Sequence, residues 1–106
     1  MNILDEFARW AEKNRERLER MGIVKFTVEP PGRNKTCGIL SLEAADFSME
    51  LLLWDSGEAE FNRGVTGGVP VLEHVDVDSP QSLSALLSRF LETGLGDHSD
   101  LGWTQA

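Results

Sequence analysis

Residues 49–61 read MELLLWDSGEAEF, and this stretch decides the fold class of the 106-residue chain. An apolar run is followed by a tight Asp55-Ser56-Gly57 turn and by a return segment with acidic residues at alternate positions. Alternation with a period of two is typical of a strand that buries one face and leaves the other in water. The stretch therefore predicts a β-hairpin.

Further short β segments flank this hairpin. Val24, Phe26 and Val28 alternate with polar residues, and residues 36–43, 46–54, 58–64 and about 69–77 have the composition of strands. The connections between them are too short for a parallel crossover, which needs about a dozen residues or more. We therefore expect a five-stranded antiparallel meander sheet.

A helix is expected on each side of these strands. Apolar residues from Ile3 to Met21 recur at three- and four-residue steps, which predicts a helix over residues 2–21. Ser79 followed by Pro80 is a strong helix start, a leucine-rich stripe follows, and Gly94 is expected to end the second helix. Each helix has one apolar stripe, so both should pack on one face of the sheet. The predicted fold class is a two-layer α+β domain over residues 1–94, followed by a flexible or docked tail over residues 95–106.

Charge and composition narrow the classes of function. The net charge is −8 and the sequence pI is near 4.6, and residues 66–106 alone hold six acidic groups against one basic group. Such acidity disfavours nucleic acid and anionic membranes as partners and favours a basic protein surface. A single cysteine, Cys37, excludes an internal disulfide. No signal peptide or membrane-spanning run is visible, so we expect a cytoplasmic protein.

No set of residues with the spacing of an active site or a metal centre stands out. Cys37 and His74 form the one nucleophile–base pair to consider, but a cysteine in an apolar strand is more commonly part of the core. Asp97, His98 and Asp100, with His74, have the chemistry of metal ligands, but a solvated tail explains the first three better. We expect no catalytic residues, no metal and no cofactor.

Acidic residues on the strands predict a docking surface instead. Alternating acids on a strand usually form its solvated face, and here that face would be the one that the helices leave open. Trp54 is expected to lie there, either as an interface hot spot or as a cover for the sheet without a partner. The candidate residues for binding a protein partner are Glu50, Trp54, Glu58, Glu60 and Glu73.

Three short motifs, in their order and spacing, resemble one known family over roughly residues 4–92. They are Phe7-Ala8-Arg9-Trp10 followed by Asn14, Leu53-Trp54-Asp55-Ser56-Gly57-Glu58, and Asp78-Ser79-Pro80 leading into the leucine-rich helix. In this combination the chain resembles the TriTu immunity proteins of bacterial polymorphic toxin systems.

The resemblance implies an antitoxin rather than an enzyme. Such a protein is expected to bind the ADP-ribosyltransferase catalytic domain of a cognate type VI secretion or Rhs-type effector, a toxin that modifies elongation factor Tu and stops translation. Binding would block the NAD site or the target site of that domain. A second class stays open, because small acidic α/β proteins also serve as secretion chaperones that hold an unfolded segment of an effector. Homodimerisation and binding outside the catalytic domain would favour the chaperone.

Overall fold

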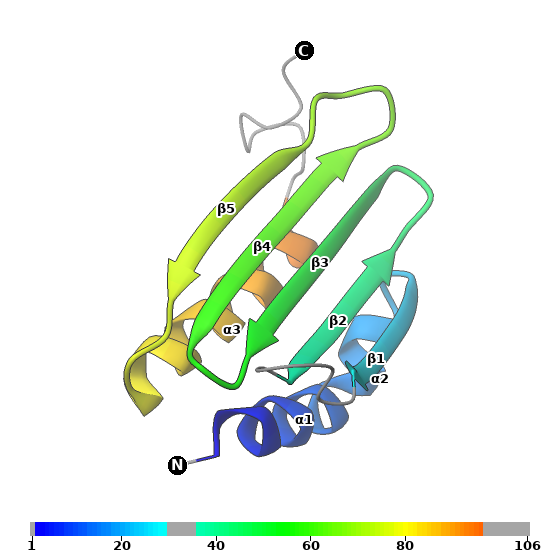
Figure 1. Ribbon diagram of the computed structural model, residues 1–106. Coiled ribbons are helices and arrows are strands. Elements are labelled where there is room, and N and C mark those ends of the chain that lie inside the picture. The colour runs from blue at the N-terminus through cyan, green and yellow to red at the C-terminus, as the bar shows by residue number, and fades with distance from the viewer. Residues whose placement is uncertain (1, 30–35, 97–106) are drawn as a thin grey trace.

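A five-stranded sheet forms one layer of the fold (Figure 1). The computed structural model describes residues 2–29 and 36–96. Within them the strands are β1 (Ile23–Glu29), β2 (Cys37–Glu43), β3 (Phe47–Trp54), β4 (Glu58–Val65) and β5 (Val71–Asp76). The strands lie in chain order, and every neighbouring pair is antiparallel. The predicted meander is therefore confirmed.

Helices form the second layer and cover one face of the sheet only (Figure 1). They are α1 (Ile3–Lys13), α2 (Arg15–Glu19) and α3 (Pro80–Leu95). On the central strand β3, every second residue from Phe47 to Leu53 is buried beneath them, and the residues between are half-buried or exposed. The two-layer α+β prediction is confirmed, and within the described residues one face of the sheet carries no helix.

Aromatic rings join the helices to the sheet. Phe90 of α3 lies 5.7 Å from Phe61 of β4 and 6.5 Å from Trp10 of α1, measured between ring centroids. Phe7 of α1 meets Phe26 of β1 edge to face at 5.1 Å. Such pairs contribute about 0.5–1.5 kcal/mol each beyond the burial of their area. The core is therefore continuous from the first helix through the sheet to the last helix.

The first helix is not continuous over residues 2–21, as the sequence pattern predicted. It breaks at Asn14, which is 8% exposed and has backbone angles of −102° and 8°. The backbone N–H and the side-chain Nδ2 of Asn14 both donate to the carbonyl oxygen of Trp10, each at 3.0 Å. A side-chain amide that competes for helix carbonyls favours a helix end over a helix interior. After the break, α2 buries Leu18 completely in the core.

The last helix also ends later than predicted, at Leu95, with Gly96 as its cap. Gly94 is buried inside the helix, where an added Cβ would lie 3.0 Å from both Met21 Sδ and Met49 Cε. This glycine therefore serves close packing rather than helix termination. The start of α3 agrees with the prediction, because Ser79 and Ser82 form a reciprocal capping box. The rest of the expected tail, residues 97–106, lies outside the described residues.

The turn between β3 and β4 connects distant parts of the sheet. Gly57 closes the turn by donating its N–H to the Trp54 carbonyl at 2.9 Å, and it has a φ of +98°. Its own carbonyl accepts from the N–H of Val77 at 2.7 Å, just after β5. Asp55 pairs with Thr36 through both a backbone and a side-chain hydrogen bond, just before β2. One turn therefore joins β3 to β4 and holds the ends of their outer neighbours, β2 and β5.

Gly57→Ala is expected to destabilise the protein by about 3 kcal/mol, because alanine would combine left-handed backbone with a steric clash against the Val77 carbonyl oxygen. The matched control is Gly67→Ala. Gly67 has a φ of +82°, but a Cβ added there meets nothing within 4 Å. This control should lose only about 1–2 kcal/mol for the backbone conformation. Urea unfolding measures both losses, and equal values would contradict a specific role for the Val77 contact.

Candidate functional site

The face of the sheet that carries no helix is here called the open face. Directly paired residues on neighbouring strands point to the same side, with Cβ atoms about 4.5–5.5 Å apart. The register therefore arranges the outward side chains of the open face in four rows, read from β1 to β5. These are Glu29, Cys37 and Trp54, continued by Glu58 and Asp76; Thr27, Ile39, Leu52, Glu60 and His74; Lys25, Ser41, Glu50, Asn62 and Leu72; and Ile23, Glu43, Ser48 and Gly64.

The open face is strongly acidic. Among the described strand residues it carries six carboxylates, from Glu29, Glu43, Glu50, Glu58, Glu60 and Asp76, against the single lysine Lys25. Like charges on one face raise the local negative potential and attract a basic partner from solution. The same charges disfavour approach of a phosphate backbone or an anionic lipid surface. The charge of this face therefore favours a positively charged partner over a negatively charged one.

An apolar patch lies at one end of the open face. It consists of Trp54, Leu52, Ile39 and Cys37, on the adjacent strands β2 and β3. Trp54, Leu52 and Ile39 are half-buried, while Cys37 is 8% exposed. Trp54 is thus on the open face as expected, although its ring is partly covered by its neighbours. A partly covered tryptophan beside carboxylates can still present a large flat surface to a partner.

Glu73 does not lie on the open face, so its grouping with Glu50, Trp54, Glu58 and Glu60 is wrong. It pairs across the ladder with Phe61, whose ring is fully buried beneath the helices. His74 and Asp76 of β5 take the outward positions instead. Glu73 is three residues from Asp76, and residues an odd number apart on a strand point to opposite faces.

On the helix side, Glu73 bridges two arginines. Its carboxylate accepts two hydrogen bonds from Arg89 of α3, at 2.8 and 3.0 Å, and one from Arg63 of β4 at 3.1 Å. The hydrogen bonds from Arg89 hold the pKa of Glu73 below its usual value, and they raise the pKa of Arg89 in turn. Both guanidinium groups also lie over the ring of Phe61. The cluster therefore ties α3 to the sheet and is structural.

Cys37 and His74 do not form a catalytic pair. They lie on β2 and β5, which are separated by two intervening strands, so about 14 Å of strand spacing lies between them. Burial raises the pKa of the Cys37 thiol, which disfavours the reactive thiolate. His74 Nε2 instead lies 3.1 Å from Asp76 Oδ1 on its own strand.

The described residues gather no metal-binding group of three or more histidine, cysteine or acidic side chains. Asp97, His98 and Asp100 lie outside the described part of the chain. Within that part, no helix combines the length and the apolar character that crossing a bilayer requires.

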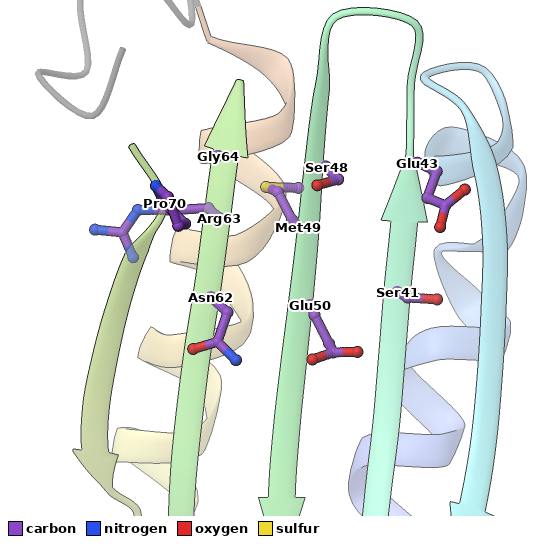
Figure 2. Close-up of a pocket in the computed structure, with 9 residues that line it drawn as sticks. All are labelled: Ser41, Glu43, Ser48, Met49, Glu50, Asn62, Arg63, Gly64 and Pro70. Atoms are coloured by element: carbon purple, nitrogen blue, oxygen red, sulfur yellow. The ribbon is translucent and has the colours of Figure 1, made fainter. Parts of the chain in front are cut away.

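A groove crosses the open face at the end opposite Trp54 (Figure 2). It has a volume of about 260 Å³ and is lined by both polar and apolar groups; the polar ones from β2, β3 and β4 include Ser41, Glu43, Ser48, Glu50 and Asn62. Of these, only Glu50 was a candidate from sequence. The others could not be grouped without the strand register, because each strand contributes only one or two of them.

The comparison with protein families agrees with this structure. The family model described as immunity protein TriTu matches residues 5–93, which is most of the chain. No match is found among curated proteins or among solved structures. The chain belongs to the TriTu immunity protein family. Its role is therefore that of an immunity protein, a class that acts by binding a cognate toxin.

Glu73→Gln is expected to lower the free energy of unfolding by about 1 kcal/mol at neutral pH, because a partly buried ion pair loses its charge. The folded-state pKa of Glu73 is below its ordinary value of 4.5. Its contribution is therefore fully present above that value and is lost as the pH falls through the lower folded-state pKa. Urea unfolding of parent and variant should show a gap at pH 7 that closes in acid.

The matched control for this experiment is Glu60→Gln, which removes a carboxylate from an exposed position of the open face. It should change the stability by less than about 0.5 kcal/mol. A Glu73→Gln loss that is as small as the control would contradict the structural role of the bridge.

Proposed function

We propose that the open face covers the catalytic site of a cognate ADP-ribosyltransferase toxin domain and so protects the cell from arrest of translation. The observation that carries the proposal is the charge of this face: six carboxylates against one lysine among the described strand residues, with no helix over them. A site that binds the pyrophosphate of NAD needs positive charge or N–H donors. An acidic sheet is the electrostatic complement of such a site.

Protection by this route needs binding only and no catalysis. The toxin is inactivated when NAD or its protein target can no longer enter the cleft, so one immunity protein neutralises one toxin molecule. Charge on the open face speeds the encounter, and the close contacts then set the lifetime of the complex. An expected one-to-one complex is the simplest consequence of this mechanism.

The residues of the proposed interface contribute to binding in different ways. Trp54 is the anchor, because burying a tryptophan removes a large apolar area from water at a low cost in side-chain entropy. Glu58 and Glu60 of β4 lie close to it, Glu50 lies further along β3, and all three provide negative charge. Glu73 is excluded from the interface, since its carboxylate is held by Arg89 and Arg63 on the helix side.

Co-expression with the catalytic domain of the effector encoded beside this gene tests the proposal. Cell growth and co-purification are scored together, with a catalytically inactive toxin domain as the control for expression. Rescue with a stable one-to-one complex is the expected result. Binding without rescue would favour the chaperone alternative, and neither binding nor rescue would overturn the proposed partner.

Trp54→Ala should weaken binding to the toxin domain at least about tenfold, because the variant loses its apolar anchor. Its stability should change little, since the Trp54 side chain is only half-buried on the open face. Trp10→Ala is the matched control. Trp10 is half-buried too, but its ring packs on the fully buried Phe90 in the helix layer, so its loss should cost more stability than the loss of Trp54 and leave the affinity of the folded protein unchanged.

Calorimetric titration and urea unfolding separate the two effects for each variant. Unchanged affinity in Trp54→Ala would remove this residue from the interface, and unfolding of the variant would make Trp54 part of the core.

A further inference from the structure

We propose that the groove at the end of the open face receives an arginine side chain of the toxin. The groove is called the acceptor groove and is defined by Ser41, Glu43, Ser48, Glu50, Asn62 and Gly64. This inference rests on the proposed function, because the partner that supplies the arginine is the toxin domain. It adds a specific chemical contact, located away from Trp54, to a surface described so far only by its charge.

The strand register brings the groove residues together. Glu50 of β3 pairs with Ser41 of β2 on one side and with Asn62 of β4 on the other. In the next row, Ser48 pairs with Glu43 and with Gly64. Figure 2 shows these polar side chains arising from three neighbouring strands around one hollow.

The hollow exists because Gly64 contributes no side chain to its row. A Cβ added to Gly64 would lie 3.5 Å from the nearest atom, Pro70 Cα, which is an ordinary contact distance. Gly64 has no positive φ, so its backbone is compatible with other residues. Neither the backbone conformation nor the packing of the free protein therefore requires glycine at position 64. The space that a side chain would fill there is open to a partner.

The carboxylates of the groove are not neutralised within the described part of the chain. Neither Glu43 nor Glu50 has an ion-pair partner there, and Lys25, the one lysine of the open face, pairs with neither. Arg63 lines the groove, but its guanidinium group is bound to Glu73 on the helix side at 3.1 Å. A cation from a partner would therefore find two available carboxylates.

The groove offers hydrogen-bond acceptors, and a guanidinium group supplies the matching donors. Ionised carboxylates only accept hydrogen bonds, and the serine hydroxyls can accept as well. Asn62 also lines the groove, but its side-chain oxygen is buried and lies on the side toward β5 in Figure 2, so the acceptors open to a partner are the carboxylates and the serine hydroxyls. A guanidinium group carries five N–H donors in a planar fork and can reach several acceptors on different strands, whereas an ammonium group is a compact point charge.

The size of the groove also favours a side chain over other cations. Its volume of about 260 Å³ is below the range of about 300–1,000 Å³ that is usual for small-molecule sites. The described residues contain no group of three or more histidine, cysteine or acidic side chains that could hold a metal ion. One long basic side chain inserted from a docked protein fits both the volume and the chemistry.

The test compares two double variants that remove the same charge from the same face. Glu43→Gln with Glu50→Gln alters the acceptor groove, and Glu58→Gln with Glu60→Gln alters the opposite end. Binding of each full-length variant to the toxin catalytic domain is measured by surface plasmon resonance. The groove variant should weaken binding about thirtyfold or more, mainly through faster dissociation. The control should lose only a few-fold, mainly through slower association.

Gly64→Leu gives a second test that changes no charge. The leucine side chain fills the groove from its floor, so binding should weaken about as much as in the groove variant, while urea unfolding should match the parent. Substitution of individual toxin arginines by lysine then identifies the inserted residue. One such substitution should weaken binding to the parent and have no further effect on the groove variant.

The possible outcomes separate this inference from the proposed function. Equal losses in the two double variants, or full affinity in Gly64→Leu, would overturn the arginine groove and leave the antitoxin proposal standing. Failure of the parent protein both to bind and to rescue would overturn both. If the parent protein binds and rescues, and if large losses of affinity are confined to the groove variants, both the arginine groove and the antitoxin proposal are supported.

Discussion

One-sided burial of the sheet is the constraint on which the rest of this structure depends. All three described helices lie on one face, so the period of two along each strand sorts every strand residue into core or water. On β3 this sorting buries Met49 and Leu51 and turns Glu50 and Trp54 outward. A shift of one residue in pairing would place carboxylates in the core, which makes the register strongly specified.

Stability and recognition are consequently assigned to opposite faces. On the helix side, the charges of Arg63, Glu73 and Arg89 neutralise one another while securing α3 to the sheet. On the open face, acidic groups accumulate with only Lys25 among the described strand residues to oppose them. Self-repulsion on that face reduces stability in the isolated protein, and a basic partner relieves it. Such a division suits an immunity protein, whose surface must be capable of rapid and tight capture.

The open face itself contains two regions of different chemistry. The apolar patch around Trp54 and the acceptor groove around Glu50 and Glu43 lie at opposite ends of the central strands. Apolar burial provides affinity with little directional preference, whereas hydrogen bonds to carboxylates demand a particular partner geometry. Two separated contacts fix the orientation of a docked protein better than one. The proposed mode of toxin binding therefore combines affinity and specificity on a single sheet.

Local sequence patterns were sufficient for the meander, the two helix regions, the capping box at Ser79 and the outward position of Trp54, because alternation, short turns and caps depend on neighbouring residues. They were insufficient for the break at Asn14, where the side-chain amide donates to the Trp10 carbonyl oxygen within an otherwise regular apolar pattern. They were also insufficient for the close packing at Gly94, which depends on contacts with Met21 and Met49. The face of Glu73 and the assembly of the acceptor groove depended on the register across several strands. Strand pairing and the docking of Arg89 set these positions, and no single segment of the chain carries that information.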